Sequence, residues 1–366
     1  MALPLPSPQR LQVTLAAMRR ASERTLVLRL RLADAAGFAW RPGQFVGLEA
    51  ADGRQRHFSI ANAAPIDDQI ELHINRAPGG AFTGHLFDTA RLGDQLWMNG
   101  PYGDFTIPPN LASDAILVAG GTGFAPIKAC LEHMAAAFEA GAAPMRTIHL
   151  YWGARTLADL YDRPGLAVLA ARLPGLSVTP VLDRGHDGCA SVRTGLVHRA
   201  LIEDFADLSG ADIYACGAPV MIEALARDCA AERGFDPARL TADAFLAGPG
   251  ESALAPPPGR PIELVFSDPA PRAVRGVEGE ALLFALKRAG ADLAAVCGGK
   301  GACGTCGVLP APNWRSRLPE PTRREARLLD FIGAQDGQRL SCRILLTADL
   351  DGLEMQTLPN TRGDPQ

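Results

Sequence analysis

The stretch Cys297-Gly298-Gly299-Lys300-Gly301-Ala302-Cys303-Gly304-Thr305-Cys306 places three cysteines in one glycine-rich loop, and Cys342 follows as a remote fourth. Thiolates are the ligands of iron–sulfur clusters, which often use three close cysteines and one distant cysteine. Glycine permits positive φ, so such a loop can bring its amide groups close to inorganic sulfur. The pattern therefore predicts a cluster held by Cys297, Cys303, Cys306 and Cys342. Structural zinc sites usually pair cysteines at CxxC spacing, and only one such pair exists here, so zinc or unliganded thiols are the alternative.

The spacing of these cysteines indicates a type of ferredoxin. Five residues separate Cys297 from Cys303, two separate Cys303 from Cys306, and the last cysteine lies in Arg339-Leu340-Ser341-Cys342-Arg343-Ile344. This spacing resembles the adrenodoxin-like two-iron, two-sulfur ferredoxins, since the plant type has four residues in the first gap. The segment Glu325–Leu329 is also similar to that group. Those carriers dock basic partners through an acidic segment, whereas this chain reads Pro321-Thr322-Arg323-Arg324-Glu325, so we do not expect the same electrostatic complementarity.

Composition places the chain among ordinary globular proteins. Its 366 residues predict two or three domains, and 47% hydrophobic with 21% charged residues is typical of globular proteins. A net charge of −4 gives no reason to expect nucleic acid. The start Met1–Pro6 lacks the basic head and apolar core of a signal peptide, and no apolar stretch is long enough to span a bilayer. Eight cysteines do not form a disulfide framework here, so we expect reduced thiols in a cytoplasmic protein.

The cysteine loop belongs to a separate C-terminal region. Residues 248–260 are rich in proline and glycine and have no helical or strand period, which predicts a semi-extended linker. Residues 261–366 then predict a short strand at 262–266, a helix near 281–289 that Gly290 ends, the cysteine loop and a final strand through Cys342. These elements suit a small α+β ferredoxin domain of the β-grasp type.

Two further domains are predicted before the linker. Residues 1–112 contain alternating strand-like runs such as Thr25–Leu32 and Ile70–Ile74, broken by turns, which indicates an antiparallel β-barrel. Residues 113–247 alternate strands with helices and predict an α/β domain with a doubly wound parallel sheet. Its expected strands are Ala115–Val118, His149–Tyr151, Val178–Leu182 and Ile213–Ala215, and its first helix carries Phe124, Ile127, Leu131, Met134 and Phe138 on one face.

A flavin signature lies in the predicted barrel. The string Arg56-His57-Phe58-Ser59 resembles the Arg-x-(Tyr/Phe)-Ser motif of the ferredoxin–NADP reductase superfamily. The resemblance implies that Arg56 binds phosphate, that an aromatic ring covers the flavin, and that the Ser59 hydroxyl lies near its reactive nitrogen. A strand arginine paired with a carboxylate is the alternative interpretation.

A second segment is also similar to that superfamily. His73-Ile74-Asn75 is followed by Gly79–Leu86, where relatives have a glycine-rich turn and a short helix whose amides and hydroxyl hold pyrophosphate. The flavin-binding residues implied here are His73, Ile74, Asn75, Gly80, Ala81 and Thr83. Relatives have Lys in place of Asn75, so either Arg76 replaces it or the contact is missing. Because a pyrophosphate segment is present, we expect FAD rather than FMN.

The predicted nicotinamide site begins at Gly120-Gly121-Thr122-Gly123-Phe124-Ala125-Pro126, between a strand and a helix. Glycines there let a pyrophosphate approach the positive end of the helix. The string resembles the GGxGxxP motif of the same superfamily, not the standard GxGxxG fingerprint; a purely structural glycine turn is the alternative. Tyr151–Arg155 and Tyr214–Pro219 match further motifs of that superfamily. The nicotinamide-binding residues implied by the resemblance are Gly121, Thr122, Gly123, Pro126, Arg155, Asp183, Cys216, Gly217 and Met221.

Two residues are expected near the reacting rings. The string Cys216-Gly217-Ala218-Pro219 matches a Cys-Gly-x-Pro motif whose cysteine lies beside the nicotinamide in relatives. Cys216 is therefore predicted to act there as a positioning group. Cys216 and Ser59 are the two predicted catalytic residues. Phe245 matches an aromatic residue that guards the flavin ring in relatives, and a plain core aromatic is its alternative. Cys130, Cys189 and Cys229 are interpreted as thiols without a role.

The choice of coenzyme depends on one position. NADP-dependent relatives place a phosphate-binding Ser-Arg pair where this chain has Asp183-Arg184. A carboxylate there repels a ribose 2′-phosphate, so we predict NADH.

Together these resemblances imply an NADH-dependent reductase that passes electrons from NADH to FAD, to a 2Fe-2S cluster and to a protein acceptor. The expected role is the reductase component of a multicomponent oxygenase. A reductase of deoxysugar biosynthesis and a non-catalytic electron-transfer subunit of a larger dehydrogenase are the alternatives. The expected partners are NADH and a protein electron acceptor such as an oxygenase component. We expect a monomer that binds neither nucleic acid nor membrane.

Overall fold

The computed structural model describes residues 8–35, 37–50, 55–65, 68–183, 192–245, 258–267, 270–291, 293, 295, 297, 299, 301 and 303–358. The chain divides into two compact units, a two-domain unit (residues 9–245) and a small unit (the described residues from 258 onward). The predicted barrel and α/β domain share the first unit. Most of the predicted linker, residues 248–257, lies outside the described residues, so the domain boundaries of the sequence analysis stay predictions.

The first part of the two-domain unit is the predicted antiparallel barrel, with strand order β4-β3-β6-β1-β2-β5. An isolated antiparallel bridge between Ile60 and Leu72 nearly closes it. The alternation of apolar residues explains this sheet, because Leu26, Leu28, Leu30 and Leu32 of β2 are all buried in the barrel core. The elements are β1 (Gln9–Arg20), β2 (Thr25–Leu32), β3 (Phe45–Glu49), β4 (Gln55–Ser59), β5 (Gln69–Asn75), α1 (Ala81–Asp88) and β6 (Gln95–Tyr102).

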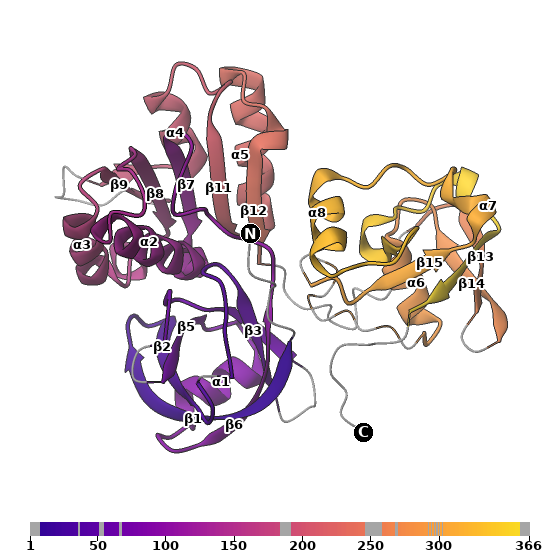
Figure 1. The fold of residues 1–366 in the computed structure, drawn as a ribbon, viewed down its shortest axis with the longest axis horizontal. Coiled ribbons are helices and arrows are strands. Elements are labelled where there is room, and N and C mark those ends of the chain that lie inside the picture. The colour runs from indigo at the N-terminus through magenta and orange to yellow at the C-terminus, as the bar shows by residue number, and fades with distance from the viewer. Residues whose placement is uncertain are drawn as a thin grey trace. The chain divides into compact units, whose positions relative to one another are not determined.

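The second part is a parallel sheet in the order β10-β9-β8-β7-β11-β12, which confirms the doubly wound prediction. Helices α2 and α3 cover one face and α4 and α5 the other (Figure 1). The strands are β7 (Ala115–Gly120), β8 (Ile148–Ala154), β9 (Leu176–Leu182), β10 (Arg193–Thr194), β11 (Asp212–Gly217) and β12 (Leu240–Ala244). The helices are α2 (Phe124–Glu139), α3 (Arg163–Arg172), α4 (Val197–Asp204) and α5 (Pro219–Arg233), with short 3-10 turns η1 (Gly121–Gly123), η2 (Leu157–Asp159) and η3 (Pro237–Arg239).

The small unit is a mixed five-stranded sheet in the order β14-β13-β17-β15-β16, as expected for a β-grasp ferredoxin domain. The predicted strand and helix are present, and Gly290 follows the helix with φ +73°. One expectation was wrong: the last predicted strand ends at Leu340, and Cys342 lies in a 3-10 turn instead. The elements are β13 (Pro261–Ser267), β14 (Pro271–Val277), α6 (Leu282–Arg288), β15 (Gly307–Pro310), α7 (Pro312–Arg315), α8 (Arg323–Phe331), β16 (Arg339–Leu340), η5 (Ser341–Arg343), η6 (Ala348–Leu350) and β17 (Leu353–Thr357).

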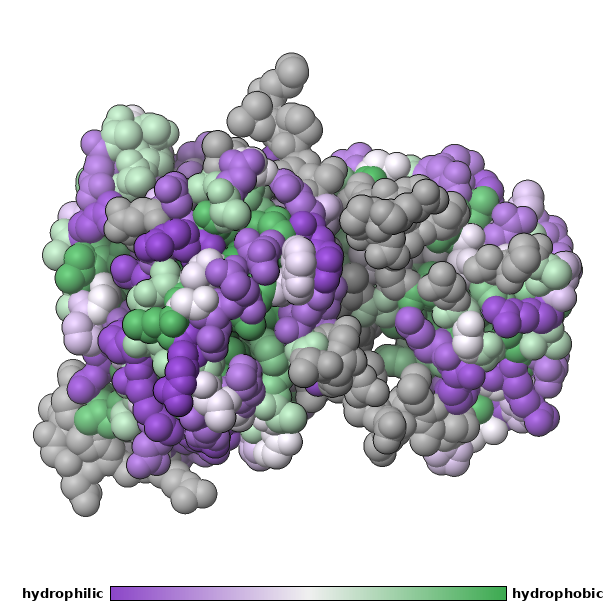
Figure 2. Space-filling model, turned by 90° about the horizontal axis from the view of Figure 1, so that it is seen from below, coloured by the Kyte–Doolittle hydropathy of each residue, from purple (hydrophilic) through white to green (hydrophobic). Residues whose placement is uncertain are grey.

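The surface shown in Figure 2 has hydrophilic and hydrophobic residues interspersed on both units. Within the part of the chain that the structure describes, every helix is too short or too polar to cross a lipid bilayer.

Candidate functional site

Two glycine turns of the α/β domain pack directly against each other. The turn η1 follows β7 and opens α2, and the turn at Gly217 follows the neighbouring strand β11. A Cβ built on Gly123 would lie 2.1 Å from the Cys216 carbonyl oxygen, so only glycine fits there. Gly121 has φ +53°, and a Cβ built on it would meet nothing within 4 Å. One side of the turn is therefore packed and the other is open, as a backbone that receives a pyrophosphate requires.

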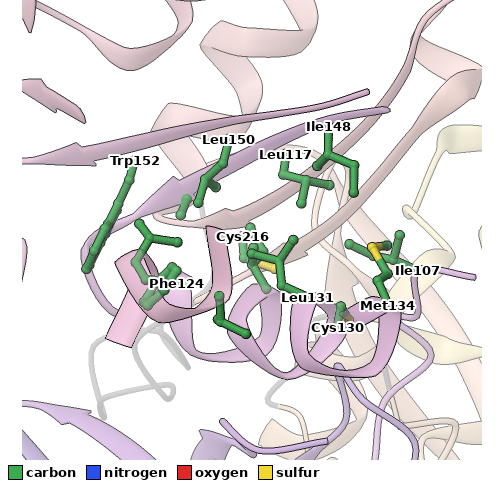
Figure 3. Packing of buried hydrophobic residues seen from close by; sticks show 14 of the residues in the cluster. Ile107, Leu117, Phe124, Cys130, Leu131, Met134, Ile148, Leu150, Trp152 and Cys216 are labelled. Atoms are coloured by element: carbon green, nitrogen blue, oxygen red, sulfur yellow. The ribbon is translucent and has the colours of Figure 1, made fainter. Parts of the chain in front are cut away.

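An aromatic pair holds the glycine turn in place. The rings of Phe124 and Trp152 stack with centroids 4.1 Å apart, and Trp152 Nε1 donates a hydrogen bond of 3.0 Å to the Gly121 carbonyl oxygen. Figure 3 shows the two rings side by side at the edge of the layer between the sheet and α2. The second predicted motif, Tyr151–Arg155, thus supports the first through Trp152. Pro126 is buried in the first turn of α2, and Thr122 is half-buried.

Cys216 lies in this same apolar layer and is fully buried (Figure 3). Its neighbour Gly217 accepts a hydrogen bond of 2.8 Å from Phe245 N, and the Met221 sulfur would lie 2.7 Å from a Cβ built on Gly120. The structure therefore brings together the predicted residues of both turns with Met221 and Phe245.

Two predicted coenzyme residues lie farther along the sheet edge. Arg155 is exposed, and its guanidinium is 3.5 Å from the Asp159 carboxylate. Asp183 is exposed directly after β9, and its amide donates to the Ala154 carbonyl oxygen at 2.9 Å. Its predicted neighbour Arg184 lies outside the described residues.

The flavin signature forms strand β4, which pairs with β3. Ser59 is buried, Phe58 lies with its ring 6.3 Å from that of Phe82, and His57 packs edge-on against Phe45 at 5.4 Å. Arg56 is half-buried and donates to the Gln55 carbonyl oxygen at 3.3 Å.

The second flavin segment is β5 followed by the glycine turn that opens α1. Asn75 is exposed at the end of β5, Ile74 is in the barrel core, and Gly80 is the N-cap residue before Ala81. Thr83 Oγ1 is already used inside the turn, since it donates to the Gly80 carbonyl oxygen and accepts from Ala77 N, both at 3.2 Å.

Arg76, the suggested replacement for the missing lysine, forms two hydrogen bonds with Asp88 of α1, at 3.1 and 2.5 Å. In this arrangement its guanidinium is committed to the helix that follows the turn.

His73 is enclosed in a buried polar cluster between the barrel and the α/β domain. Its Nε2 lies 3.0 Å from Glu71 Oε1, and its Nδ1 lies 2.8 Å from the Tyr161 hydroxyl. Lys128 Nζ of α2 lies 3.1 Å from Glu71 Oε1 and 2.6 Å from Glu132 Oε1. These side chains connect strand β5 to the helix that begins at the nicotinamide turn.

The same cluster holds the loop that follows Ser59. Lys128 Nζ donates to the Ala61 carbonyl oxygen at 3.1 Å, and Glu132 Oε2 accepts from Ala63 N at 2.9 Å. The loop after the flavin signature and the helix α2 are thus joined by two polar contacts of one Lys–Glu pair.

Charges in this cluster stabilise one another. Burial alone would raise the pKa of Glu71, but the hydrogen bond with His73 and the charge of Lys128 outweigh it and hold that pKa well below the usual 4.5. Burial opposes the charged form of Lys128, but the carboxylates of Glu71 and Glu132 favour it more strongly. The pKa of Lys128 is therefore raised. Burial, then Asp162 and Glu71, raise the pKa of Tyr161, which stays a neutral hydroxyl.

The four predicted cluster ligands are all buried and none forms a disulfide. Two contacts link them two by two. Cys306 Sγ and Cys342 Sγ are 3.3 Å apart, and Cys303 Sγ accepts from Cys297 N at 3.3 Å. The pKa of Cys303 is raised mainly by burial and next by the Cys297 thiol. The pKa of Cys306 is raised mainly by the Cys342 thiol and next by burial.

This arrangement fits a cluster held by four thiolates. No group of three or more His, Cys, Asp or Glu side chains converges as a single-ion site within the described residues. Three of the cysteines lie on one loop and Cys342 lies on the turn η5. Four cysteines are the usual ligands of a two-iron, two-sulfur cluster. Gly299, Gly301 and Gly304 have φ of +93°, +64° and +73°, so the loop backbone adopts the predicted positive-φ conformation.

A second buried ion pair fixes the fourth cysteine. Arg339 Nε and Nη2 donate to the two Glu325 oxygens, both at 2.9 Å, and Leu340 N donates to Glu325 Oε1 at 3.0 Å. Ser341 Oγ donates to the Cys306 carbonyl oxygen at 2.9 Å. Helix α8 and the turn that carries Cys342 are thereby held to each other.

Sequence reasoning missed Glu71, Lys128 and Glu132, and it placed Trp152, Glu325 and Arg339 in matched motifs without assigning them a positioning role. Lys128 and Glu132 gave a signal, because they are charged residues four apart in a helix whose other side chains are largely apolar.

Three family models match the chain in the predicted order. They are the oxidoreductase FAD-binding domain over residues 12–107, the oxidoreductase NAD-binding domain over residues 117–227 and the 2Fe-2S iron-sulfur cluster binding domain over residues 265–347. These matches confirm the predicted cofactor classes FAD, NAD and 2Fe-2S.

Curated relatives match about half to three fifths of this chain. The reductase subunit of an aromatic O-demethylase from Amycolatopsis sp. is 38% identical over 54% of this chain and 58% of its own length. The reductase component of the naphthalene 1,2-dioxygenase system from Pseudomonas putida is 34% identical over 61% and 65%. CDP-6-deoxy-L-threo-D-glycero-4-hexulose-3-dehydrase reductase from Yersinia pestis is 34% identical over 60% and 64%. The chain thus spans less than two thirds of the length of these relatives.

Two solved structures are similar to this chain in fold, one at higher sequence identity and one over more of the chain. A cytochrome P450 reductase from Amycolatopsis is 33% identical with a TM-score of 0.58, over 65% of this chain and 70% of that one. An intact type IV self-sufficient cytochrome P450 monooxygenase covers 94% of this chain and 41% of its own, with a TM-score of 0.65 and 20% identity, which shows a shared fold alone.

Proposed function

Because the chain belongs to the ferredoxin–NADP reductase superfamily and has FAD-binding, NAD-binding and 2Fe-2S domains, we propose that it is an NADH-dependent reductase serving a protein electron acceptor. The observation that carries the proposal is the presence of four neighbouring buried cysteines, none in a disulfide, in a chain whose flavin signature is joined to the helix of its glycine turn. When bound, the flavin accepts a hydride from NADH and the cluster passes single electrons onward.

The residues of this chain bind and orient these groups. The open side of the turn at Gly121, Thr122 and Gly123 receives the coenzyme pyrophosphate, while Cys216, Gly217 and Met221 form the packed side. Ser59 and Arg56 are proposed to contact the flavin from strand β4, with His57 and Phe58 beside them. The turn at Gly80, Ala81 and Thr83 supplies backbone amides for its pyrophosphate. Phe245 is proposed to cover the flavin ring, and Cys297, Cys303, Cys306 and Cys342 to hold the cluster.

We propose an oxygenase component as the acceptor, since two of the relatives are reductase components of oxygenase or demethylase systems by name. A reductase of deoxysugar biosynthesis is the second candidate, because the Yersinia relative is equally similar. An electron-transfer subunit of a larger dehydrogenase is not favoured, since the two nicotinamide turns are intact and packed together. We further propose a cytoplasmic monomer; none of the seven cysteines in the described residues forms a disulfide, which supports a reducing compartment.

A reductase assay with the isolated chain tests this function. We expect NADH-dependent reduction of both ferricyanide and cytochrome c. Cys303→Ser should abolish cytochrome c reduction and the cluster spectrum but spare ferricyanide reduction. No turnover by the wild-type chain with either acceptor would favour the dehydrogenase-subunit alternative.

The coenzyme is tested separately. The exposed carboxylate of Asp183 lies at the end of β9, and we propose that it repels a 2′-phosphate. Steady-state kinetics should give a higher kcat/KM for NADH than for NADPH. Asp183→Ser should lower the ratio of these two kcat/KM values about tenfold. A wild-type preference for NADPH would end this inference.

A further inference from the structure

The first turns of helix α8 carry an exposed pair of positive charges. Arg323 and Arg327 are four residues apart on one face, and both are exposed. Neither forms an ion pair within the described residues. Residues 312–345 contain seven arginines against four acidic residues, so the surroundings are also basic.

Other arginines of this segment are committed to the fold. Arg315 pairs with Asp336 at 2.9 Å, and the Arg317 guanidinium lies 4.7 Å from the centre of the Trp314 ring. Arg339 is buried against Glu325. Arg323 and Arg327 therefore differ from these three in having no such role.

The positions of these two residues are unfavourable for the helix itself. Arg323 is the first residue of α8, where the helix dipole is positive and cations are destabilising. Like charges at i and i+4 also repel each other. Glu325 is the one acidic residue in the first turn, and its carboxylate is occupied by Arg339. Arg323 and Arg327 are therefore exposed at positions that do not favour the helix, as residues that serve an external partner can be.

Helix α8 is held close to the proposed cluster at both of its ends. Glu325 binds Leu340 N, two residues before Cys342. Just beyond the helix, Ile332 packs on the cysteine loop, because a Cβ built on Gly304 would lie 2.7 Å from Ile332 Cγ2. A protein that docks on α8 is thereby brought next to the thiols.

We propose that the face of α8 formed by Arg323 and Arg327 docks an acidic surface of the protein that accepts electrons from the cluster. The inference rests on the proposed function and adds the chemistry of the partner. Electron-transfer complexes are small and transient, and complementary charges raise their association rate. Two exposed arginines on one helix face suit such an encounter.

The test uses the full chain with cluster and flavin bound. The acceptors are an acidic protein, cytochrome b5, a basic protein, cytochrome c, and ferricyanide. The variant is Arg323→Glu with Arg327→Glu. The control is Arg272→Glu with Arg275→Glu on β14, which changes the same charge on exposed residues at the opposite edge of the sheet from β16. Arg275 lies 3.3 Å from Glu263 and Arg272 lies over the Phe266 ring, so the unfolding midpoint of the control is measured as well.

We expect the α8 variant to lose about tenfold in kcat/KM for cytochrome b5 at low salt, and the loss to shrink as salt rises. Its rate with cytochrome c should not fall, and its cluster absorbance and ferricyanide rate should match those of the control. Equal rates of the α8 variant and the control with cytochrome b5 would overturn the docking surface. A fall with both cytochromes alike would overturn it too, because charge would then not select the partner. Failure of the wild-type chain to reduce its cluster with NADH would instead refute the proposed function.

Discussion

Glu71 of the two-domain unit and Glu325 of the small unit are both buried carboxylates held by a cation. The Glu71 pair connects two domains, whereas the Glu325 pair connects two elements of one domain. Glu71 lies in the barrel and meets Lys128 of the α/β domain, so its ion pair joins two domains. Glu325 meets Arg339 within one domain and joins a helix to the turn that carries Cys342. We expect the first pair to orient the two proposed cofactor sites relative to each other, whereas the second shapes the proposed cluster site from inside.

The two pairs also differ in how completely each carboxylate is satisfied. Glu325 accepts a bidentate pair of hydrogen bonds from Arg339 and one from a backbone amide, in a geometry that fits the planar guanidinium. Glu71 shares the compact ammonium group of Lys128 with Glu132 and the Ala61 carbonyl oxygen, and it relies on His73 and Arg29 as well. The difference predicts a stability effect for the small unit and a rate effect for the two-domain unit.

The largest expected effect comes from Glu325→Ala. It leaves the Arg339 guanidinium buried without its partner, and the free energy of unfolding of the small unit should fall by about 3–5 kcal/mol. Denaturant unfolding followed by cluster absorbance measures this. The exposed Glu320→Ala is the matched control, and equal midpoints for the two variants would contradict the role of Glu325. Replacing both partners, Glu325→Leu with Arg339→Met, should recover much of the loss.

Lys128→Met should act mainly on rate. It removes the cation that holds the loop after Ser59, and a small displacement of two reacting groups slows transfer by tenfold to about a hundredfold. Stopped-flow reduction of bound flavin by NADH measures the step directly, while flavin content reports the fold. Lys128→Arg should restore part of the rate, and the exposed Lys287→Met should change nothing. Unaltered flavin reduction in Lys128→Met would show that the cluster does not orient the sites.

Acid should weaken the two-domain unit through Glu71. Because the pKa of this carboxyl is held below 4.5 in the folded state, its contribution is complete above that pH and is lost as the pH falls. The free energy of unfolding should decline by about 1.4 kcal/mol per pH unit in this range from Glu71 alone. Urea unfolding between pH 5 and 3 should show a shallower decline for Glu71→Gln than for Glu223→Gln, whose side chain is exposed. Parallel curves would contradict the role of Glu71.

The smallest effect concerns a cation beside the cluster loop. A Cβ built on Gly301 would lie 2.1 Å from Arg343 Nε, so this guanidinium packs on the loop. Positive charge near a cluster favours its reduced form. Arg343→Gln should therefore lower the midpoint potential of the cluster in a redox titration and leave the unfolding midpoint nearly unchanged. A potential that stays the same would separate Arg343 from the site.

Elements that depend on neighbouring residues could be predicted from the sequence. Local signals predicted the elements well: the glycine turn at Gly121–Gly123, the strand Thr25–Leu32 and the helix from Phe124 all follow from periodicity or backbone freedom. The nearness of three of the four cysteines was predictable too, since they share one short loop; their role as cluster ligands stays a prediction.

The positioning residues were not predictable, because their partners are remote in sequence. Glu71 and Lys128 are far apart along the chain, and only the packing of α2 on the barrel brings them together. His73 was expected at the flavin, yet its side chain is enclosed by Glu71 and Tyr161. The strand expected through Cys342 ends early because Ser341 turns to bind the Cys306 carbonyl oxygen. The roles of the site residues themselves stay predictions.

Anaerobic mixing of the purified full chain with one equivalent of NADH tests the central claim most directly. Two irons and acid-labile sulfide should be present per chain, and flavin absorbance should bleach first, followed by cluster absorbance in the same turnover. A preparation that contains zinc in place of iron, or a cluster that stays oxidised after the flavin is reduced, would contradict the account.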